Sequence, residues 1–206
     1  FITQANFNGV EFSIEHPRAF LYFPGENSTQ WERNWIPFVY NNSLFLATQL
    51  SPHRILRPAL GSQKCEEVAS SNFSSSWIWG NPKTGTAAHP DGDRYLALFH
   101  SIKVMPSIHS DGKSIQHYFM GAYTFEDHPP FRVTAISKAP IIGNHFYHGP
   151  EYTMCKPCRV VFPCGFVFDK EFIWVVFGRQ DHEVWMAKLD KKGLYNSMEP
   201  CNLDSK

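Results

Sequence analysis

The sequence predicts an all-β protein with the architecture of a β-propeller. About eleven short apolar runs of strand length are separated by turns, and no segment shows a 3.6-residue apolar period of helix length. The runs come in groups of three or four joined by short turns, with longer loops between the groups. A propeller blade is a four-stranded meander, so this grouping favours about three blades over a β-sandwich.

The group of strands nearest the C-terminus is the clearest blade. Its apolar runs cover Val160–Phe168, Phe172–Phe177 and Val184–Leu189. Short polar turns separate them, and such turns allow only antiparallel neighbours. The second turn, Gly178–His182, combines a Gly, an Arg, an Asp and a His. It is therefore a candidate site at one end of an apolar meander.

The preceding groups follow the same pattern. The predicted strands cover Ile36–Tyr40, Leu44–Leu50, Ser51–Pro58, Arg94–Met105, His117–Phe125 and Phe131–Ile136. The proline-bounded run Ser51–Pro58 is expected at a sheet edge, and the Ser-rich residues 59–76 are expected to form a long loop. We assign residues 1–190 to one propeller domain, incomplete at its N-terminus, and residues 191–206 to a C-terminal tail.

Composition excludes several classes of protein. Aromatic residues make up 16% of the 206 residues and charged residues only 18%, which is the opposite of a disordered chain. Lys plus Arg equals Asp plus Glu, at 19 each, so no global field attracts nucleic acid or an anionic membrane. No apolar run reaches the roughly 18–20 residues that span a bilayer, so no membrane insertion is expected.

The sequence leaves the compartment open between the secretory pathway or Golgi lumen and the cytoplasm. Three Asn-x-Ser/Thr sequons occur, at Asn27, Asn41 and Asn72, but no signal peptide is visible. The chain begins at Phe1 rather than Met, so we expect a processed chain or a fragment. Five cysteines are an odd number, and a chain of this size does not require a disulfide framework.

Polar clusters recur where the groups of strands begin or end. They are Glu15–Arg18, Glu32–Asn34, His53-Arg54 with Arg57, His100, and Arg179 with Asp181-His182. One rim of the blades surrounds a central depression, where several Arg, a His and an Asn would suit an anion such as phosphate. An Asp among them could donate a proton or act electrostatically. The alternative is that each cluster is simply a polar turn between strands.

A second constellation has the residue types of a zinc site. It comprises His145, His148, Cys155 and Cys158. The spacing matches no common zinc finger, and the cysteines can equally be small, half-buried side chains at the start of a strand. We therefore expect no metal.

An ordered set of short motifs resembles one known family. The motifs are Glu15-His16-Pro17-Arg18, Glu32-Arg33-Asn34 followed by Arg57-Pro58, Tyr95–His100, Gly121-Ala122, Val160-Val161-Phe162-Pro163-Cys164-Gly165 and Phe177–Asp181. In this order they resemble the β-mannoside phosphorylases and mannosidases of glycoside hydrolase family 130, and the related β-1,2-mannosyltransferases. Together the motifs run from about Glu15 to Leu189, which is nearly the whole chain.

The resemblance implies a five-bladed propeller, of which this chain would supply about three to four blades or a fragment. It implies His16 and Asp181 as candidate catalytic residues. It implies that substrate or phosphate is bound by Arg33, Asn34, Arg57 and His100, and the polar clusters add Arg18 and Arg179 as candidates. His16 stands where the family has the Asp that donates a proton to the glycosidic oxygen, which changes the reach and charge of the acid.

We therefore expect a carbohydrate-active protein that cleaves or transfers β-mannosyl residues. Its partners would be a β-mannoside oligosaccharide or a sugar phosphate, with inorganic phosphate as a co-substrate and no cofactor. The alternative is a non-catalytic sugar-binding or interaction propeller that has lost the acidic Asp. The sequence gives no oligomeric state.

Overall fold

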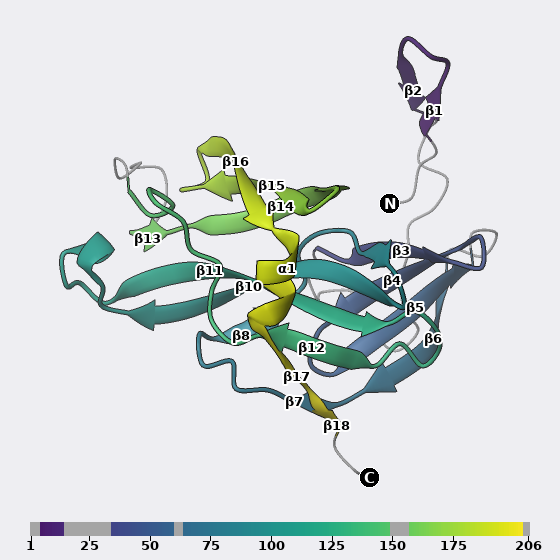
Figure 1. Ribbon diagram of the computed structural model, residues 1–206, viewed down its shortest axis with the longest axis horizontal. Coiled ribbons are helices and arrows are strands. Elements are labelled where there is room, and N and C mark those ends of the chain that lie inside the picture. Colours follow the sequence, from purple (N-terminus) through teal and green to yellow (C-terminus); the bar gives the residue numbers. More distant parts are fainter. Residues whose placement is uncertain (1–4, 15–33, 60–63, 149–156, 204–206) are drawn as a thin grey trace.

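The computed structural model describes residues 5–14, 34–59, 64–148 and 157–203, and it confirms the all-β prediction. The described strands form three large sheets and two small two-stranded ones. Figure 1 shows the second sheet in the middle of the molecule, with the first and third sheets beside it. None of the helices in these ranges is long and apolar enough to cross a membrane.

The first sheet is an antiparallel meander in chain order. It contains β3 (Ile36–Tyr40), β4 (Ser43–Gln49), β5 (His53–Ala59) and β6 (Lys64–Ser71). The predicted strands Ile36–Tyr40 and Leu44–Leu50 are confirmed and form a hairpin, with Asn41 and Asn42 in the left-handed region (φ 46° and 56°) that Asn tolerates.

Two predictions for the first sheet are wrong. Strand β5, predicted at an edge, has partners on both sides, and β6 lies within the predicted loop. β6 escaped detection because it is an edge strand whose only buried side chain is Cys65. An edge strand facing solvent needs no apolar alternation.

The second sheet is built on one long hairpin. Strands β10 (Arg94–Met105) and β11 (Ile115–Glu126) pair from Arg94↔Glu126 to Met105↔Ile115. The other strands are β8 (Asn81–Lys83), β9 (His89–Asp91), β12 (Val133–Ser137), β13 (Cys158–Arg159) and β17 (Met198–Pro200). The short 3-10 helix η1 (Ile108–Ser110) lies in the hairpin connection. The three strands predicted between Arg94 and Ile136 are thus confirmed within a few residues.

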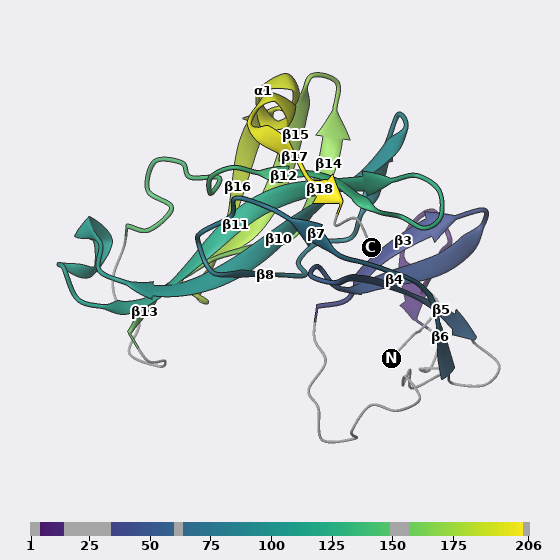
Figure 2. The same cartoon turned by 90° about the horizontal axis from the view of Figure 1, so that it is seen from below.

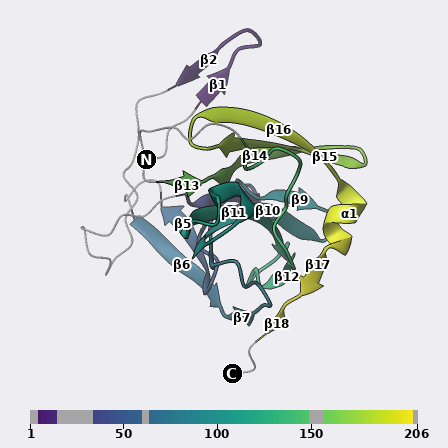
Figure 3. The ribbon, with the colours of Figure 1, turned by 90° about the vertical axis from the view of Figure 1, so that its left-hand side faces the viewer.

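The third sheet confirms the predicted C-terminal meander. Its strands are β14 (Val161–Asp169), β15 (Phe172–Arg179) and β16 (Glu183–Asp190), paired in that order. One face of β15 buries Ile173, Val175 and Phe177 completely. This sheet and the first one lie on different sides of β10–β11, as the view along the long axis shows (Figure 3).

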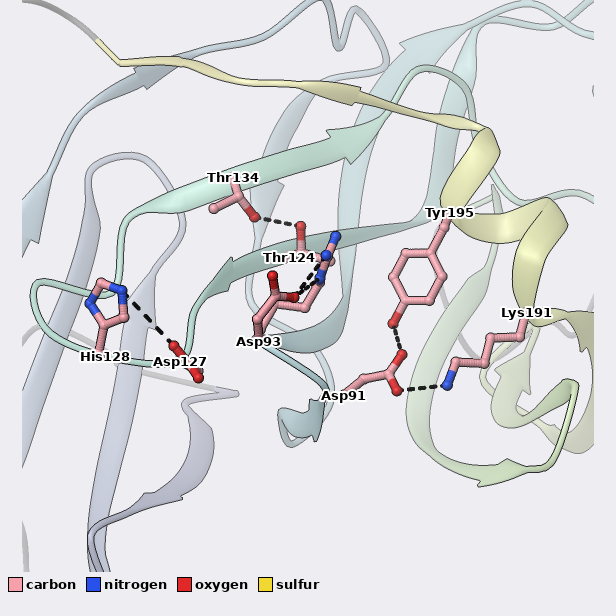
Figure 4. Close-up of polar contacts among 9 residues, drawn as sticks. Asp91, Asp93, Thr124, Asp127, His128, Thr134, Lys191 and Tyr195 are labelled. Carbon is pink, nitrogen blue, oxygen red and sulfur yellow. Dashed lines mark hydrogen bonds and ion pairs between the residues drawn. The ribbon is translucent and has the colours of Figure 1, made fainter.

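The residues after β16 fold back onto the second sheet. Asp190 caps α1 (Lys191–Asn196), which leads into β17 and then β18 (Asn202–Leu203), the partner of β7 (Phe73–Ser74). Lys191 Nζ and Tyr195 Oη both donate to the Asp91 carboxylate, at 2.6 and 2.5 Å (Figure 4). Residues 191–203, assigned above to a tail, therefore tie the third sheet to the second.

An aromatic core joins the first sheet to the second. Phe38 packs within 5.1–5.3 Å, between ring centroids, of Tyr95, Phe125 and Phe131. Figure 2 shows these sheets side by side from below. The hairpin of β1 (Ala5–Phe7) and β2 (Phe12–Ile14) is exposed along both strands and lies apart from the sheets (Figure 1).

Candidate functional site

A cavity of about 640 Å³ opens where the three large sheets meet. Its lining is mainly polar and comes from parts of the chain that are far apart in sequence. The lining residues are Asn34, Thr48, Gln49, Leu50, Ser51, Asn81, Pro82, Lys83, Thr84, His100, Ile102, Tyr118, Phe162 and Asp181. A polar lining of hydroxyl and amide groups suits a ligand rich in hydroxyls.

Three residues predicted from sequence meet at this cavity. They are Asn34, His100 and Asp181, which precede β3, lie within β10 and follow β15, respectively. Asn34 and Asp181 have left-handed backbones, with φ of 59° and 53°. Both residue types adopt this conformation more readily than most, so the turns can direct their side chains without severe strain.

The turn that carries Asp181 is fixed by its neighbour Gln180. The backbone N–H of Gln180 donates to the Val160 carbonyl at 3.0 Å. The side-chain Oε1 of Gln180 accepts from the Val160 N–H at 2.9 Å. Gln180 is itself buried, and this reciprocal pair locks the start of the third sheet against the turn. Asp181 is thereby held at the cavity by β14 as well as by its own hairpin.

His100 is held by a hydrogen bond to the backbone carbonyl of Thr84 and by two aromatic rings. Its Nδ1 lies 2.7 Å from the Thr84 carbonyl oxygen. The ring lies 4.6 Å from that of Phe162 and stacks at 11° on Tyr118, with centroids 6.2 Å apart. Burial, together with a smaller effect of the Lys83 charge, lowers the pKa of His100 to about 4 despite the hydrogen bond to Thr84. The ring is therefore neutral at about pH 7.

Sequence reasoning missed Lys83, Tyr118 and Phe162. Lys83 lies outside every predicted strand, but it pairs with His100 across β8 and β10. Tyr118 and Phe162 lie in predicted strands, where aromatic side chains usually signal core. Phe162 belongs to the Val160–Gly165 motif, which could have selected it, whereas only the register of the strands places Lys83 and Tyr118 at the cavity.

Two predicted binding residues lie elsewhere. Arg57 is exposed on β5, where its guanidinium pairs with Glu66 at 2.6 Å. Arg179 is buried, pairs with Glu183 at 2.6 Å, donates to the His145 carbonyl at 3.0 Å and lies 4.2 Å from the Trp185 ring centroid. Neither lines the cavity, so a role for either in binding phosphate stays a prediction.

The remaining predicted residues, His16, Arg18 and Arg33, lie outside the described residues. Along the described cavity wall Lys83 is the one cationic side chain and Asp181 the one carboxylate. This wall is therefore close to electrically balanced.

The possible zinc constellation is only partly described, since Cys155 lies outside the described ranges. His145 and His148 are exposed, with their Nδ1 atoms 3.2 Å apart. Cys158 is half-buried on β13. Within the described residues no group of three or more His, Cys, Asp or Glu side chains could hold a metal ion.

Comparison with known proteins gives a likeness of structure only. No family model matches the chain, and no curated protein matches it by sequence. Among solved structures it is similar to a β-1,2-mannobiose phosphorylase from Listeria innocua in complex with β-1,2-mannobiose, with a TM-score of 0.57 and 14% identity over 81% of this chain and 46% of that one.

Two further solved structures show a similar match. A putative glycoside hydrolase from Parabacteroides distasonis gives a TM-score of 0.56 and 13% identity over 89% of this chain and 57% of that one. The other is a member of glycoside hydrolase family 130, described with hydrolases that target β-1,2-mannosidic linkages in Candida mannan. It gives a TM-score of 0.53 and 13% identity over 95% of this chain and 57% of that one.

These likenesses confirm the predicted fold class. The family 130 structures are five-bladed β-propellers, and the first sheet described here is a four-stranded antiparallel meander like a blade of that fold. The described residues form no closed ring, and the chain spans about half the length of these solved structures. At 13–14% identity the comparison shows the fold alone.

Proposed function

We propose that this chain belongs to a carbohydrate-active protein that binds a β-mannoside in the cavity of Asn34, His100 and Asp181, and cleaves or transfers its mannosyl group. The observation that carries the proposal is the convergence of these three residues. They were selected from separate motifs of one sequence pattern, and they line one polar cavity. The similar solved structures, one of them a mannobiose complex, support the same substrate class.

The residues at the cavity have complementary chemistry for a sugar. Asn34 offers both a donor and an acceptor, and the Asp181 carboxylate accepts from hydroxyls. Lys83 supplies a positive charge for an anionic group. Inorganic phosphate or a sugar phosphate would be held by Lys83 together with Arg18 and Arg33, and direct stabilisation by cationic side chains needs no metal.

Cleavage would require a proton donor at the glycosidic oxygen. The sequence assigns this role to His16, whose imidazolium would give its proton to the leaving oxygen while the mannosyl carbon forms a bond to phosphate, water or an acceptor sugar. Asp181 would stabilise the positive charge that develops on the sugar ring.

A second candidate function is sugar binding without catalysis. Glycoside cleavage commonly uses two carboxyl groups, one as the acid and one on the opposite side of the sugar. Asp181 is the one carboxylate of the described cavity wall, and position 16 carries a His. Both observations favour a protein that binds a sugar in the pocket but no longer cleaves the glycosidic bond.

Incubation with β-1,2-mannobiose, with and without inorganic phosphate, separates the two functions. Mannose 1-phosphate formed only with phosphate indicates phosphorolysis, and free mannose indicates hydrolysis. Asp181→Asn should reduce turnover by about a hundredfold or more, because a charge at the reacting sugar is lost. Asp111→Asn, an exposed position that does not line the cavity, is the matched control.

The same assay has outcomes against each proposal. Binding of mannobiose without any turnover, together with activity created by His16→Asp, supports the non-catalytic function. Turnover that is abolished by His16→Ala excludes it. If the protein neither binds nor converts any β-mannoside, both functions are wrong.

A further inference from the structure

The hairpin of β1 and β2 has one apolar face and one polar face. Its register pairs Phe7 with Phe12, and their rings contact each other with centroids 4.7 Å apart. Ile14, two residues after Phe12, lies on the same side, because side chains alternate along a strand. Asn6 pairs with Ser13 on the opposite side. The hairpin is therefore amphipathic, although it lies apart from the three large sheets (Figure 1).

The apolar face of this hairpin is uncovered. Phe7, Phe12 and Ile14 are 58%, 71% and 72% exposed. A two-stranded hairpin is at best marginally stable alone in water, and it needs further strands or another apolar surface to pack against. The amphipathic pattern therefore indicates that the Phe7 and Phe12 side packs against another part of a protein.

The open face of the third sheet is a second uncovered apolar surface. It crosses all three strands, since the register aligns Val167 with Trp174 and Val176 with Met186. Val184 lies two residues before Met186 on the same side of β16. Val167, Val184 and Met186 are exposed, whereas Trp174 and Val176 are half-buried. Two sheets can bury such apolar faces against each other, so this face suits the apolar side of the hairpin.

The charges at the two surfaces are complementary. Glu11 is the one charged residue of the hairpin, residues 5–14. Lys188 lies on the open face, where its ammonium contacts the Trp174 ring. The carboxylates of this face, Asp169 and Asp190, accept from the Trp174 indole and from a backbone N–H of α1. Glu11 and Lys188 can therefore pair at the rim of a contact between the two surfaces.

A second copy of the chain provides what each surface lacks. Both surfaces are exposed in the same chain, so the hairpin does not cover the third sheet of its own copy. Each chain has one such hairpin and one such open face. A reciprocal exchange between two copies uses all four surfaces and closes with two-fold symmetry.

We propose that the hairpin of β1 and β2 is an arm that packs its Phe7 and Phe12 side on the open face of the third sheet in a second copy of this chain. In the resulting dimer each copy gives one arm and receives one. The residues of this contact do not line the sugar cavity, so the dimer is independent of the proposed function.

Analytical ultracentrifugation of the full chain tests the exchange. The wild type should be a dimer. Phe7→Lys with Phe12→Lys should raise the dimer dissociation constant by about a hundredfold or more, because each arm loses two aromatic side chains from the contact. Asn6→Lys with Ser13→Lys is the matched control, since it adds the same charges to the polar side of the same hairpin. It should change the dissociation constant by less than about threefold.

A mixture of two variants distinguishes packing of the arm from non-specific association. One variant carries Phe7→Lys with Phe12→Lys and keeps its open face. The other carries Val184→Lys with Met186→Lys and keeps its arm. Each variant alone should be monomeric, because it lacks one of the two surfaces. The mixture should contain a complex with one copy of each, because one intact arm and one intact face remain.

Several outcomes would overturn the proposal. A monomeric wild type does so, whether the hairpin then packs on its own chain or on a different protein. Dimers that persist in the Phe7 and Phe12 variant, or that the polar-side control loses equally, do so as well. The absence of a mixed complex at high protein concentration has the same meaning. Circular dichroism checks that each variant keeps the β-sheet content of the wild type.

Discussion

Two buried histidines show how the same residue serves different purposes in this fold. His53 and His100 each place Nδ1 against a backbone carbonyl, of Phe131 at 2.8 Å and of Thr84 at 2.7 Å. Burial lowers the pKa of each to about 4. His100 lines the cavity, whereas His53 packs against Tyr123 and Phe125, and its buried Nε2 has no hydrogen-bond partner within the described ranges. His53 is thus a structural group whose neutrality the fold requires.

Stability should therefore decrease on acidification. The pKa of His53 is lowered from 6.5 to about 4 in the folded protein, so the unfolded chain binds the proton first as the pH falls through that window. The contribution is complete above about pH 6.5 and is lost progressively towards about pH 4. Between about pH 7 and about pH 5, His53 alone should account for a loss of about 2 kcal/mol.

Urea unfolding at the two pH values measures this effect. His53→Phe should weaken the pH dependence but not remove it, because His100 titrates in the same direction. His128→Gln is the control, since that side chain is exposed. An unchanged pH dependence in the His53 variant contradicts the assignment.

At the scale of elements, the turn between β15 and β16 carries one residue that lines the cavity and one that stabilises the fold. Asp181 faces the cavity, whereas Arg179 turns to the other side of the hairpin, under Trp185 and against Glu183. Through the His145 carbonyl, Arg179 also fixes the loop after β12. Two members of one sequence motif therefore have unrelated roles, because β15 ends at Arg179 and the left-handed backbone at Gln180 and Asp181 (φ 57° and 53°) turns the chain before Asp181.

Removing Arg179 should cost far more stability than removing Arg57. Arg179→Met leaves a partly buried Glu183 without its ion pair and the His145 carbonyl without its donor, and we expect a loss of about 2–3 kcal/mol. Arg57→Met breaks a solvent-exposed pair and should cost less than about 1 kcal/mol. Chemical unfolding of the two variants makes the comparison, and equal losses would contradict it.

At the scale of the molecule, the third sheet has two unlike faces. One face buries Ile173, Val175 and Phe177 completely. The opposite face carries Val167, Val184 and Met186, which are 59%, 80% and 62% exposed. The strand register brings Val167 beside Trp174 on this open face. Contiguous exposed apolar area of this kind is unusual on a soluble protein that acts alone.

The open face should make the isolated chain bind hydrophobic dyes and self-associate. The double variant Val184→Lys with Met186→Lys should lower dye fluorescence and shift size-exclusion elution to smaller species, with little change in thermal stability. Val175→Lys, which buries a charge on the other face, should unfold the sheet. Unchanged association in the double variant would show that another surface is responsible.

The sequence by itself determined the strands whose side chains alternate between core and solvent. The meander from Val161 to Asp190 is found as predicted, because apolar patterning and short turns specify it locally. The strands β10 and β11 are also found close to their predicted bounds, because each contains a continuous buried apolar run. It also selected Asn34, His100 and Asp181, through separate motifs that follow one another along the chain in the order of the family they resemble.

The tertiary structure alone decided what those residues face. Strand register brings Lys83 beside His100 and aims Arg179 away from Asp181, and edge strand β6 has no apolar pattern to reveal it. The His100 ring is held by one carbonyl 16 residues away in the chain, that of Thr84. Pairings between distant strands are set by packing of the whole sheet, which no local stretch of sequence encodes.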